Sequence, residues 1–181
     1  SNDQEEAIRE LQKAKDKLEE ILRQLREEER LKLLAALEAR FQRMLAMQLL
    51  VYDGTLKLAK VPAADRGSPH AARSLQLARQ EEEIVVEANK AITLLKEDGT
   101  AVAFPEAAGQ MRDDMQQVVG RLERSDVAEL TQSIEKDIIA ALEEMIEALQ
   151  KEMEKRDQQK QQGQEGQQQG EKPDSDLIEQ L

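Results

Sequence analysis

The sequence predicts an all-α fold, an elongated antiparallel bundle of about four helices whose long N-terminal helix extends as a coiled-coil arm. Aromatic residues make up only 2% of the 181 residues, which is too few for a typical sheet protein. The abundant residues are Ala, Leu, Glu, Gln, Lys and Arg, which lose little rotamer freedom in a helix. Apolar residues also recur at spacings of three and four along most of the chain, which is the period of a helix.

The first predicted element is a highly charged helix that begins near residue 5. Its apolar residues form a narrow stripe of the coiled-coil type, with alternating spacings of three and four. The stripe comprises Leu11, Ala14, Leu18, Ile21 and Leu25. Because so narrow a stripe cannot form a globular core alone, we expect residues 1–30 to be an arm. It should pair with another helix through Leu11, Leu18, Ile21 and Leu25, and the flanking charges should select the partner and the register.

A wider apolar stripe begins at Leu31, which suits a helix that contacts two or three neighbours. No Pro or Gly separates it from the arm, so we expect one helix from about residue 5 to the neighbourhood of Asp53 or Lys60. The segment Asp53-Gly54-Thr55 resembles residues 98–100, and we interpret both as helix-exit sequences; the alternative is a duplicated helical unit. If the first segment is a true stop, residues 56–61 form a separate packed segment.

A loop is predicted at residues 61–67 by their Pro and Gly content. Ser68 is expected to be the N-cap of a second helix, which runs from Pro69 to about Asp98 and is ended by Gly99. Residues 100–104 are short and apolar with no sheet to join, so we expect them to be irregular.

Pro105 opens a third predicted helix, and residues 126–129 form a variant of the capping box that starts a fourth. Because the turn at residues 124–126 is tight, helices three and four should be antiparallel neighbours. These helices place the bundle domain at residues 31–156. The apolar stripe of the fourth helix comprises Leu130, Ile134, Ile138, Ala141, Leu142, Met145, Ile146, Leu149 and Met153.

The C-terminal part changes character after Arg156. Gln and Gly dominate residues 157–173, which lack the apolar surface to offset chain entropy, so we expect a disordered linker. Residues 174–181 resemble the start of a further helix that the end of the chain truncates. The chain opens with Ser1 rather than Met, so we also expect that a preceding segment has been removed.

Composition excludes several classes of function. The net charge is −12 and aromatics are scarce, which argues against nucleic acid as a partner. The absence of Cys excludes disulfides and thiolate metal sites. No apolar run approaches the ~20 residues that a helix needs to span a bilayer.

The sequence contains no recognisable catalytic, cofactor-binding or metal site. His70 is the single histidine, whereas di-iron bundles and zincins need at least two, and we interpret it as an exposed helix-terminal residue. Ser68 is better explained as a helix cap than as a nucleophile. The acidic residues Glu81–Glu83, Glu87 and Asp113–Asp114 are interpreted as solvated faces, because consecutive carboxylates fan out by about 100° per residue. The alternative is a divalent cation site.

Two further sets of residues lie on or beside the apolar stripes. Gln48 and Asn89 either fix helix register or mark the boundary of the core. The methionines mostly follow helical spacing and are interpreted as core residues; the alternative is an adaptable peptide groove. They are Met44, Met47, Met111, Met115, Met145 and Met153.

Four blocks of the sequence carry a family resemblance, namely Leu31–Thr55, Ala103–Ala107, Met111–Met115 and Asp137–Met145. They resemble an uncharacterised bacterial family of long, coiled-coil-rich, cell-envelope-type proteins with Gln/Gly-rich tracts, over roughly residues 25–153. The resemblance implies helices, a location in the bacterial cell envelope or periplasm, and an unknown function without catalytic residues to carry over. It also implies that this chain is a fragment of a longer protein.

These observations predict a non-enzymatic structural or protein–protein interaction domain that acts through helix pairing. The expected partner is a protein, either a second copy or another helical protein, with no cofactor, nucleic acid or small-molecule substrate. One alternative is a membrane-surface module, because basic residues outnumber acidic ones beside the apolar stripe of residues 31–62. A second is an enzyme that borrows residues from outside this chain. The basic residues are Lys32, Arg40, Arg43, Lys57 and Lys60, against Glu38 and Asp53.

Overall fold

The computed structural model describes the backbone of residues 1–99 and 103–179, and the side chains of residues 1–99 and 104–163. This part of the chain consists of helices and contains no strand, which confirms the predicted all-α class. The elements are α1 (Asn2–Ala59), η1 (Ala63–Asp65, a 3₁₀ turn), α2 (Ser68–Asp98), α3 (Ala103–Glu123) and α4 (Glu129–Glu179). The long N-terminal helix is likewise confirmed. Of the irregular segment expected at residues 100–104, residues 100–102 lie outside the described residues, whereas Ala103 and Phe104 are already part of α3, so the expectation is wrong for these two.

The chain folds into two compact units, and both α1 and α4 contribute to each of them. Unit 1 comprises residues 1–34 and 152–181, and unit 2 comprises residues 35–151.

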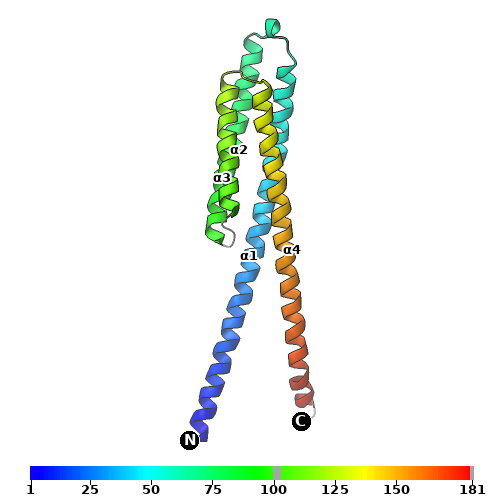
Figure 1. Ribbon diagram of the computed structural model, residues 1–181. Coiled ribbons are helices and arrows are strands. Elements are labelled where there is room, and N and C mark those ends of the chain that lie inside the picture. Colours follow the sequence, from blue (N-terminus) through cyan, green and yellow to red (C-terminus); the bar gives the residue numbers. More distant parts are fainter. Residues whose placement is uncertain (100–102, 180–181) are drawn as a thin grey trace. The chain divides into compact units, whose positions relative to one another are not determined.

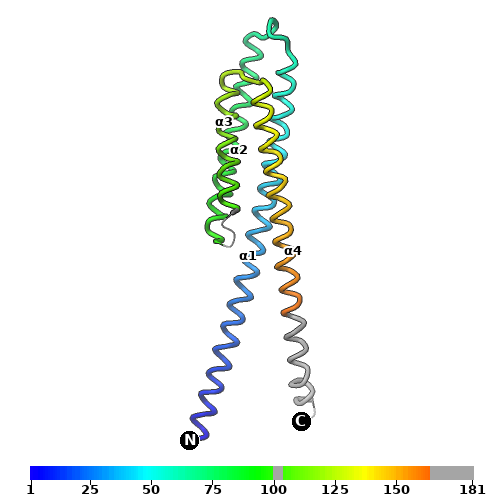
Figure 2. The backbone as a smooth tube through the Cα atoms, viewed as in Figure 1, coloured from blue at the N-terminus to red at the C-terminus, as the bar shows by residue number. Residues whose placement is uncertain are grey.

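Unit 2 is an antiparallel four-helix bundle. Its segments of α1, α2, α3 and α4 run alternately in opposite directions (Figure 1), and α2 and α3 pack side by side (Figure 2). Apolar residues from all four helices fill the centre, because each helix buries one stripe against the other three. The largest fully buried apolar side chains are Leu37, Phe41, Met44, Leu77, Ile84, Met111, Met115, Leu122, Ile138, Leu142 and Leu149.

The two Asp-Gly-Thr segments have different structural roles. Gly99 has a φ of 64° and is the left-handed C-cap of α2, as predicted. Gly54, in contrast, lies inside α1 and does not stop the helix, so the helix-exit interpretation is wrong there. A Cβ atom at Gly54 would lie 2.7 Å from Cδ2 of the buried Leu77. Glycine at this position therefore permits the close approach of α1 and α2.

The start of α2 differs from the prediction in two respects. The N-cap is Gly67, without a side-chain capping bond, and Ser68 is already helical. His70 is buried rather than exposed, and its Nε2 lies 3.0 Å from the carbonyl oxygen of Leu58. The imidazole thus joins the start of α2 to the last turn of α1, where the Leu58 carbonyl oxygen also accepts a hydrogen bond from the backbone N–H of Val61.

The turn between α3 and α4 is tight, as expected, with Ser125 in the left-handed region at a φ of 58°. Asp126 pairs with Arg121 at 3.0 Å and accepts a hydrogen bond from the backbone N–H of Ala128. The helix itself begins only at Glu129, so Asp126 stabilises the turn instead of capping the first turn of α4. Leu130 lies outside the core, with 57% of its surface exposed, although the predicted stripe included it; the adjacent Thr131 is buried instead.

The C-terminal part of α4 departs from the expectation of disorder. The helix continues from Glu129 to Glu179 through the predicted linker at 157–173 and into residues 174–179, which do not start a new helix. Gln is a good helix former, and lengthening an existing helix needs no new nucleus. Each Gly in the tract costs only about 1 kcal/mol relative to Ala.

Candidate functional site

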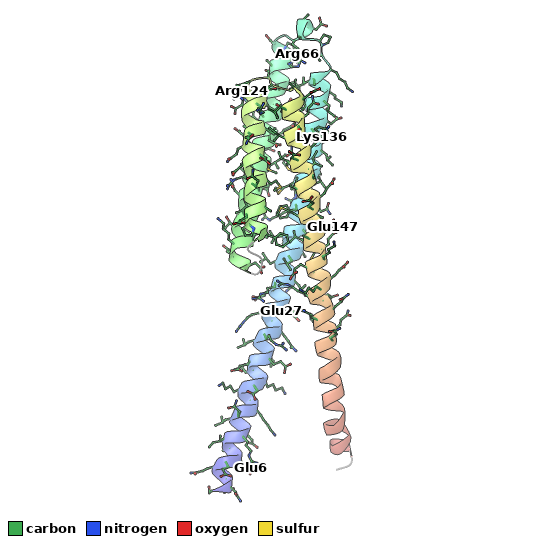
Figure 3. The ribbon with its side chains drawn as sticks, in the orientation of Figure 1. Glu6, Glu27, Arg66, Arg124, Lys136 and Glu147 are labelled. Carbon is green, nitrogen blue, oxygen red and sulfur yellow. The ribbon has the colours of Figure 1, made fainter. Side chains whose placement is uncertain are left out.

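A stripe of large aliphatic side chains lies exposed on the part of α1 that belongs to unit 1. All four predicted pairing residues belong to it: Leu11 is 70% exposed, Leu18 58%, Ile21 45% and Leu25 51%. Successive leucines seven residues apart turn by only about 20° around a helix, so they share one face. We call this surface the arm stripe, and it comprises Ile8, Leu11, Leu18, Ile21, Leu22 and Leu25. Figure 3 shows the side chains of this segment, from Glu6 to Glu27.

The opposite face of the same segment is the one that contacts α4. Between residues 2 and 30, only Glu20, Glu27 and Arg30 are partly buried. Glu20 follows Leu18 by two residues and Glu27 follows Leu25 by two, which places each acid about 200° around the helix from its leucine. Around residues 23–28, α4 therefore contacts mainly the side of α1 away from the arm stripe, and the residues of that stripe stay exposed.

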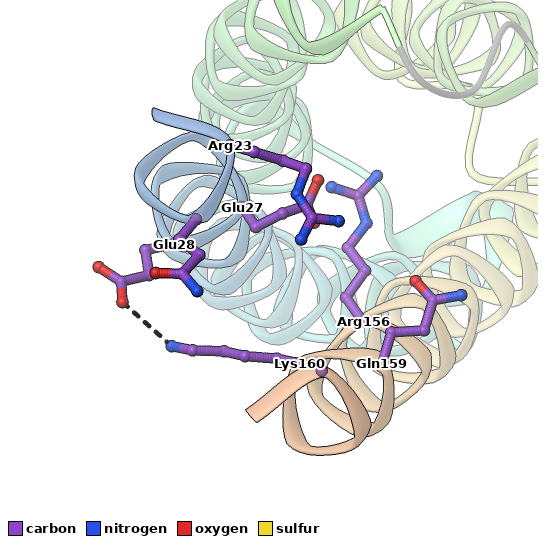
Figure 4. A pocket seen from close by; sticks show the side chains of 8 residues that line it. Arg23, Glu27, Glu28, Arg156, Gln159 and Lys160 are labelled. Carbon is purple, nitrogen blue, oxygen red and sulfur yellow. Dashed lines mark hydrogen bonds and ion pairs between the residues drawn. The ribbon is translucent and has the colours of Figure 1, made fainter. Parts of the chain in front are cut away.

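The contact between α1 and α4 in unit 1 is a charged cleft of about 230 Å³ (Figure 4). Lys160 pairs with Glu28 across it at 3.3 Å, and the side chains of Arg23, Glu27 and Arg156 converge in its centre. Other charges are paired along one helix, with Arg30 on Glu27 at 3.1 Å and Arg156 on Glu152 at 3.0 Å. Positive and negative side chains thus alternate in the cleft. This arrangement joins the two helices and favours neither an anionic nor a cationic ligand.

A second polar feature lies inside unit 2, where three helices bring uncharged and acidic side chains together in the core. We call it the carboxyl cluster, and it comprises Gln48 and Thr55 of α1, Glu81 of α2, and Thr131 and Glu135 of α4. All five side chains have no exposed surface. The Thr55 hydroxyl oxygen lies 3.1 Å from Oε2 of Glu135 and 3.0 Å from the Val51 carbonyl oxygen, and its single proton is donated to one of these acceptors at a time.

Burial shifts the acidity of both carboxyl groups strongly. Loss of hydration raises the pKa of Glu81 to about 8, and the nearby charge of Glu135 adds to this shift, while Gln48 opposes it. Burial also raises the pKa of Glu135 to about 8, against the opposing hydrogen bond from Thr55. In the absence of a cation, both side chains are therefore mainly protonated near pH 7.

The sequence interpretation missed this cluster, because it treated Glu81 as part of a solvated acidic face and did not single out Glu135. A signal was present in the spacing. Glu81 lies four residues after Leu77 and three before Ile84, both on the buried stripe of α2. Glu135 lies three residues before Ile138 on the stripe of α4. Glu82 and Glu83 are exposed, so the solvated-face interpretation holds for these two residues.

The side-chain amides of Gln48 and Asn89, which the sequence placed on or beside the apolar stripes, differ in burial. Gln48 is fully buried, whereas Asn89 is exposed and accepts a hydrogen bond of 3.0 Å from Arg112 on α3.

Most of the methionines are core residues, as predicted. Met44, Met111, Met115 and Met145 are buried, while Met47 and Met153 are partly exposed.

Most of the apolar stripe that suggested a membrane-surface module lies inside unit 2, although Leu49 and Leu50 are exposed. Leu37, Phe41 and Met44 have no exposed surface, so the folded bundle does not present them to lipid. The flanking Arg40 pairs with Glu87 of α2 at 3.3 Å, which uses part of the basic surface within the bundle. Among the described residues, no helix is long and apolar enough to cross a membrane.

The described residues include no group of three or more His, Asp or Glu side chains placed to hold a metal ion. Comparison of the chain with protein-family models, curated proteins and solved structures finds no match. The arm stripe and the carboxyl cluster are therefore interpreted on their own chemistry.

Proposed function

We propose that this chain is a non-enzymatic interaction domain that self-associates by pairing the N-terminal parts of α1 from two or more copies. The observation that carries the proposal is the uncovered arm stripe, which places six large aliphatic side chains on one side of a charged helix. Full burial of a Leu or Ile side chain contributes roughly 1.5–3 kcal/mol, so a stripe of this length offers a substantial driving force for association.

The order of residues around the helix supports pairing of the coiled-coil type. Leu11, Leu18 and Leu25 recur every seven residues and occupy the a positions of a heptad, with Ala14 and Ile21 at the d positions. Helices with this pattern bury the a and d side chains against each other. Most α4 contacts lie away from the arm stripe, but Glu28, the next d position after Ile21, pairs with Lys160 of α4. The arm can therefore pair through residues 8–25 while unit 1 keeps its own internal contacts.

The charges beside the stripe favour copies of this chain in parallel orientation. In a parallel pair, Glu10 at a g position faces Lys15 at the next e position of the neighbouring copy, which is an attractive contact. An antiparallel pair that overlaps the whole stripe has its centre near residue 16. It would bring Lys15 and Lys17 close to the same lysines of the other copy, which is repulsive.

The a and d residues influence how many copies associate. Leu at a combined with Ile at d favours three or four strands over two. The small Ala14 at another d position allows closer approach of the backbones in that layer. We therefore expect a parallel oligomer of at least two chains, whose copy number a mass measurement will give.

The test is the molar mass in solution, measured by light scattering over a range of protein concentrations, for the parent and for L18D/L25D. The parent should reach at least twice the chain mass of 20.5 kDa. The variant should remain at the chain mass, because two charges would have to be buried in the pairing surface, while its circular dichroism stays helical.

A matched control is R9Q/K13Q, which also changes the net charge by −2 but alters exposed positions on the opposite side of the helix. This variant should associate like the parent. A parent that stays at the chain mass at every concentration would overturn self-association. An equal loss of association in both variants would show that net charge, and not the stripe, drives it.

A further inference from the structure

The carboxyl cluster contains more oxygen atoms than the described residues can satisfy. Both carboxylate oxygens of Glu81, Oε1 of Glu135, Oγ1 of Thr131 and Oε1 of Gln48 are buried without a close hydrogen-bond partner. No ion pair with Lys, Arg or His involves Glu81 or Glu135 in the described part of the chain. Leaving such groups unpaired in a protein interior is costly, so a partner is expected.

The unsatisfied atoms belong to three different helices and converge on one region of the bundle. The charge of Glu135 acts on Glu81, and the Gln48 amide is near enough to act on Glu81 as a hydrogen-bond donor, although the two make no hydrogen bond of good geometry. These three groups are therefore close neighbours. Thr131 lies one turn before Glu135 on the same buried face of α4. Thr55 joins the cluster through its 3.1 Å hydrogen bond to Glu135.

We propose that the carboxyl cluster binds one hard divalent cation, with Glu81 and Glu135 as charged ligands and Gln48, Thr55 and Thr131 as neutral oxygen ligands. Two carboxylates balance the charge of one divalent ion, which removes the need for a buried basic side chain. Because the described residues place fewer than three carboxylate or histidine ligands together, amide and hydroxyl oxygens must complete the coordination.

The ligand types select the class of ion. All five side chains offer oxygen, which suits Ca²⁺, Mg²⁺ and Mn²⁺, whereas Zn²⁺ is usually bound by nitrogen and sulfur. Mg²⁺ dehydrates reluctantly and keeps several waters, while Ca²⁺ accepts six to eight oxygens in flexible geometry. A site enclosed entirely by protein side chains therefore fits Ca²⁺ best.

In the experiment, the intact chain is first unfolded in urea with EDTA. It is then refolded either without metal or with Ca²⁺, Mg²⁺ or Zn²⁺, and the refolded samples are compared. Refolding in the presence of the ion gives it access to a site that is closed in the folded bundle. The measurements are the melting temperature and the stoichiometry of ⁴⁵Ca²⁺ retained after gel filtration. We expect one retained Ca²⁺ per chain and a rise of several degrees in melting temperature, since a ligand that binds only the native state stabilises it.

E81Q/E135Q keeps the shape of both side chains and removes their charge, so it should retain no Ca²⁺ and show no shift. E82Q/E83Q makes the same chemical change at exposed neighbours and should behave like the parent. If E81Q/E135Q does not fold, Gln48→Leu provides the second variant, which should retain less Ca²⁺ than the parent. Absence of a retained ion in the refolded parent, or equal retention in E81Q/E135Q, would overturn the proposal and leave protons as the sole partners of the pair.

Discussion

The carboxyl groups of Glu81 and Glu135 couple the stability of unit 2 to pH. Each pKa is raised from 4.5 to about 8 in the folded chain, so the folded state holds protons that the unfolded state releases. The stability that this protonation provides is complete below about pH 4.5 and is lost as the pH rises to about 8.

We therefore predict that, in EDTA, the free energy of unfolding in urea decreases between pH 5 and pH 8 by on the order of several kcal/mol. In E81Q/E135Q the neutral amides do not titrate, so most of this slope should disappear. Urea titrations of both proteins across this pH range provide the check. Parallel profiles would mean that the two carboxyl groups are not the source of the pH dependence.

Two glycines inside helices should respond in opposite ways to the same substitution. Gly109 of α3 has no atom within 4 Å of an added Cβ, so Gly109→Ala should stabilise the chain by about 0.5–1 kcal/mol through helix propensity. At Gly54 the added Cβ would lie 2.7 Å from Cδ2 of Leu77, which is itself fully buried. Gly54→Ala should therefore destabilise, because overpacking costs about 1–3 kcal/mol. Thermal unfolding of both variants measures the difference, and an equal gain at both sites would contradict the close packing of α1 on α2.

At the scale of elements, helical periodicity was sufficient to predict the course of α1, the end of α2 at Gly99 and most of the core. It failed where a side chain's role depends on a neighbour distant in sequence. Ser68 and His70 were assigned by their place at a helix start, but His70 is buried because the carbonyl oxygen of Leu58 offers it a partner. Glu81 was likewise interpreted as one of three consecutive solvated acids. Its spacing from Leu77 and Ile84 places it on the buried stripe of α2 instead.

The core of α4 offers a direct test of this periodicity. Leu142 is fully buried and Leu130 is 57% exposed, although both were predicted on one stripe. Leu142→Ala should lower the free energy of unfolding by about 2–5 kcal/mol, the usual range for a buried aliphatic side chain. Leu130→Ala should change it by less than about 0.5 kcal/mol, as is usual for surface positions. Urea unfolding compares the two, and similar losses would show that Leu130 packs in the native state.

At the scale of the whole molecule, the two units have different relations to their surroundings. Unit 2 buries its apolar stripes within the bundle. Its buried carboxyl groups, Glu81 and Glu135, need a proton or a cation to balance their charge. Unit 1 instead leaves the arm stripe exposed, while residues 23–28 of α1 contact α4 through charges of both signs. The sequence was sufficient to predict the stripe, because coiled-coil spacing is local. It could not reveal which face α4 covers, since that depends on pairing of residues as far apart as Glu28 and Lys160.

The central claim is that the arm pairs in parallel with other copies of this chain, and cysteine cross-linking tests it most directly. The chain has no Cys, so Ala14→Cys introduces a single thiol at a d position. In a parallel oligomer, equivalent d positions face each other closely enough for a disulfide to form. Mild oxidation should convert A14C to a covalent dimer, while Lys13→Cys, on the outer face, should remain mostly uncross-linked. If A14C stays monomeric on a non-reducing gel, or cross-links no better than K13C, parallel pairing through the arm stripe is contradicted.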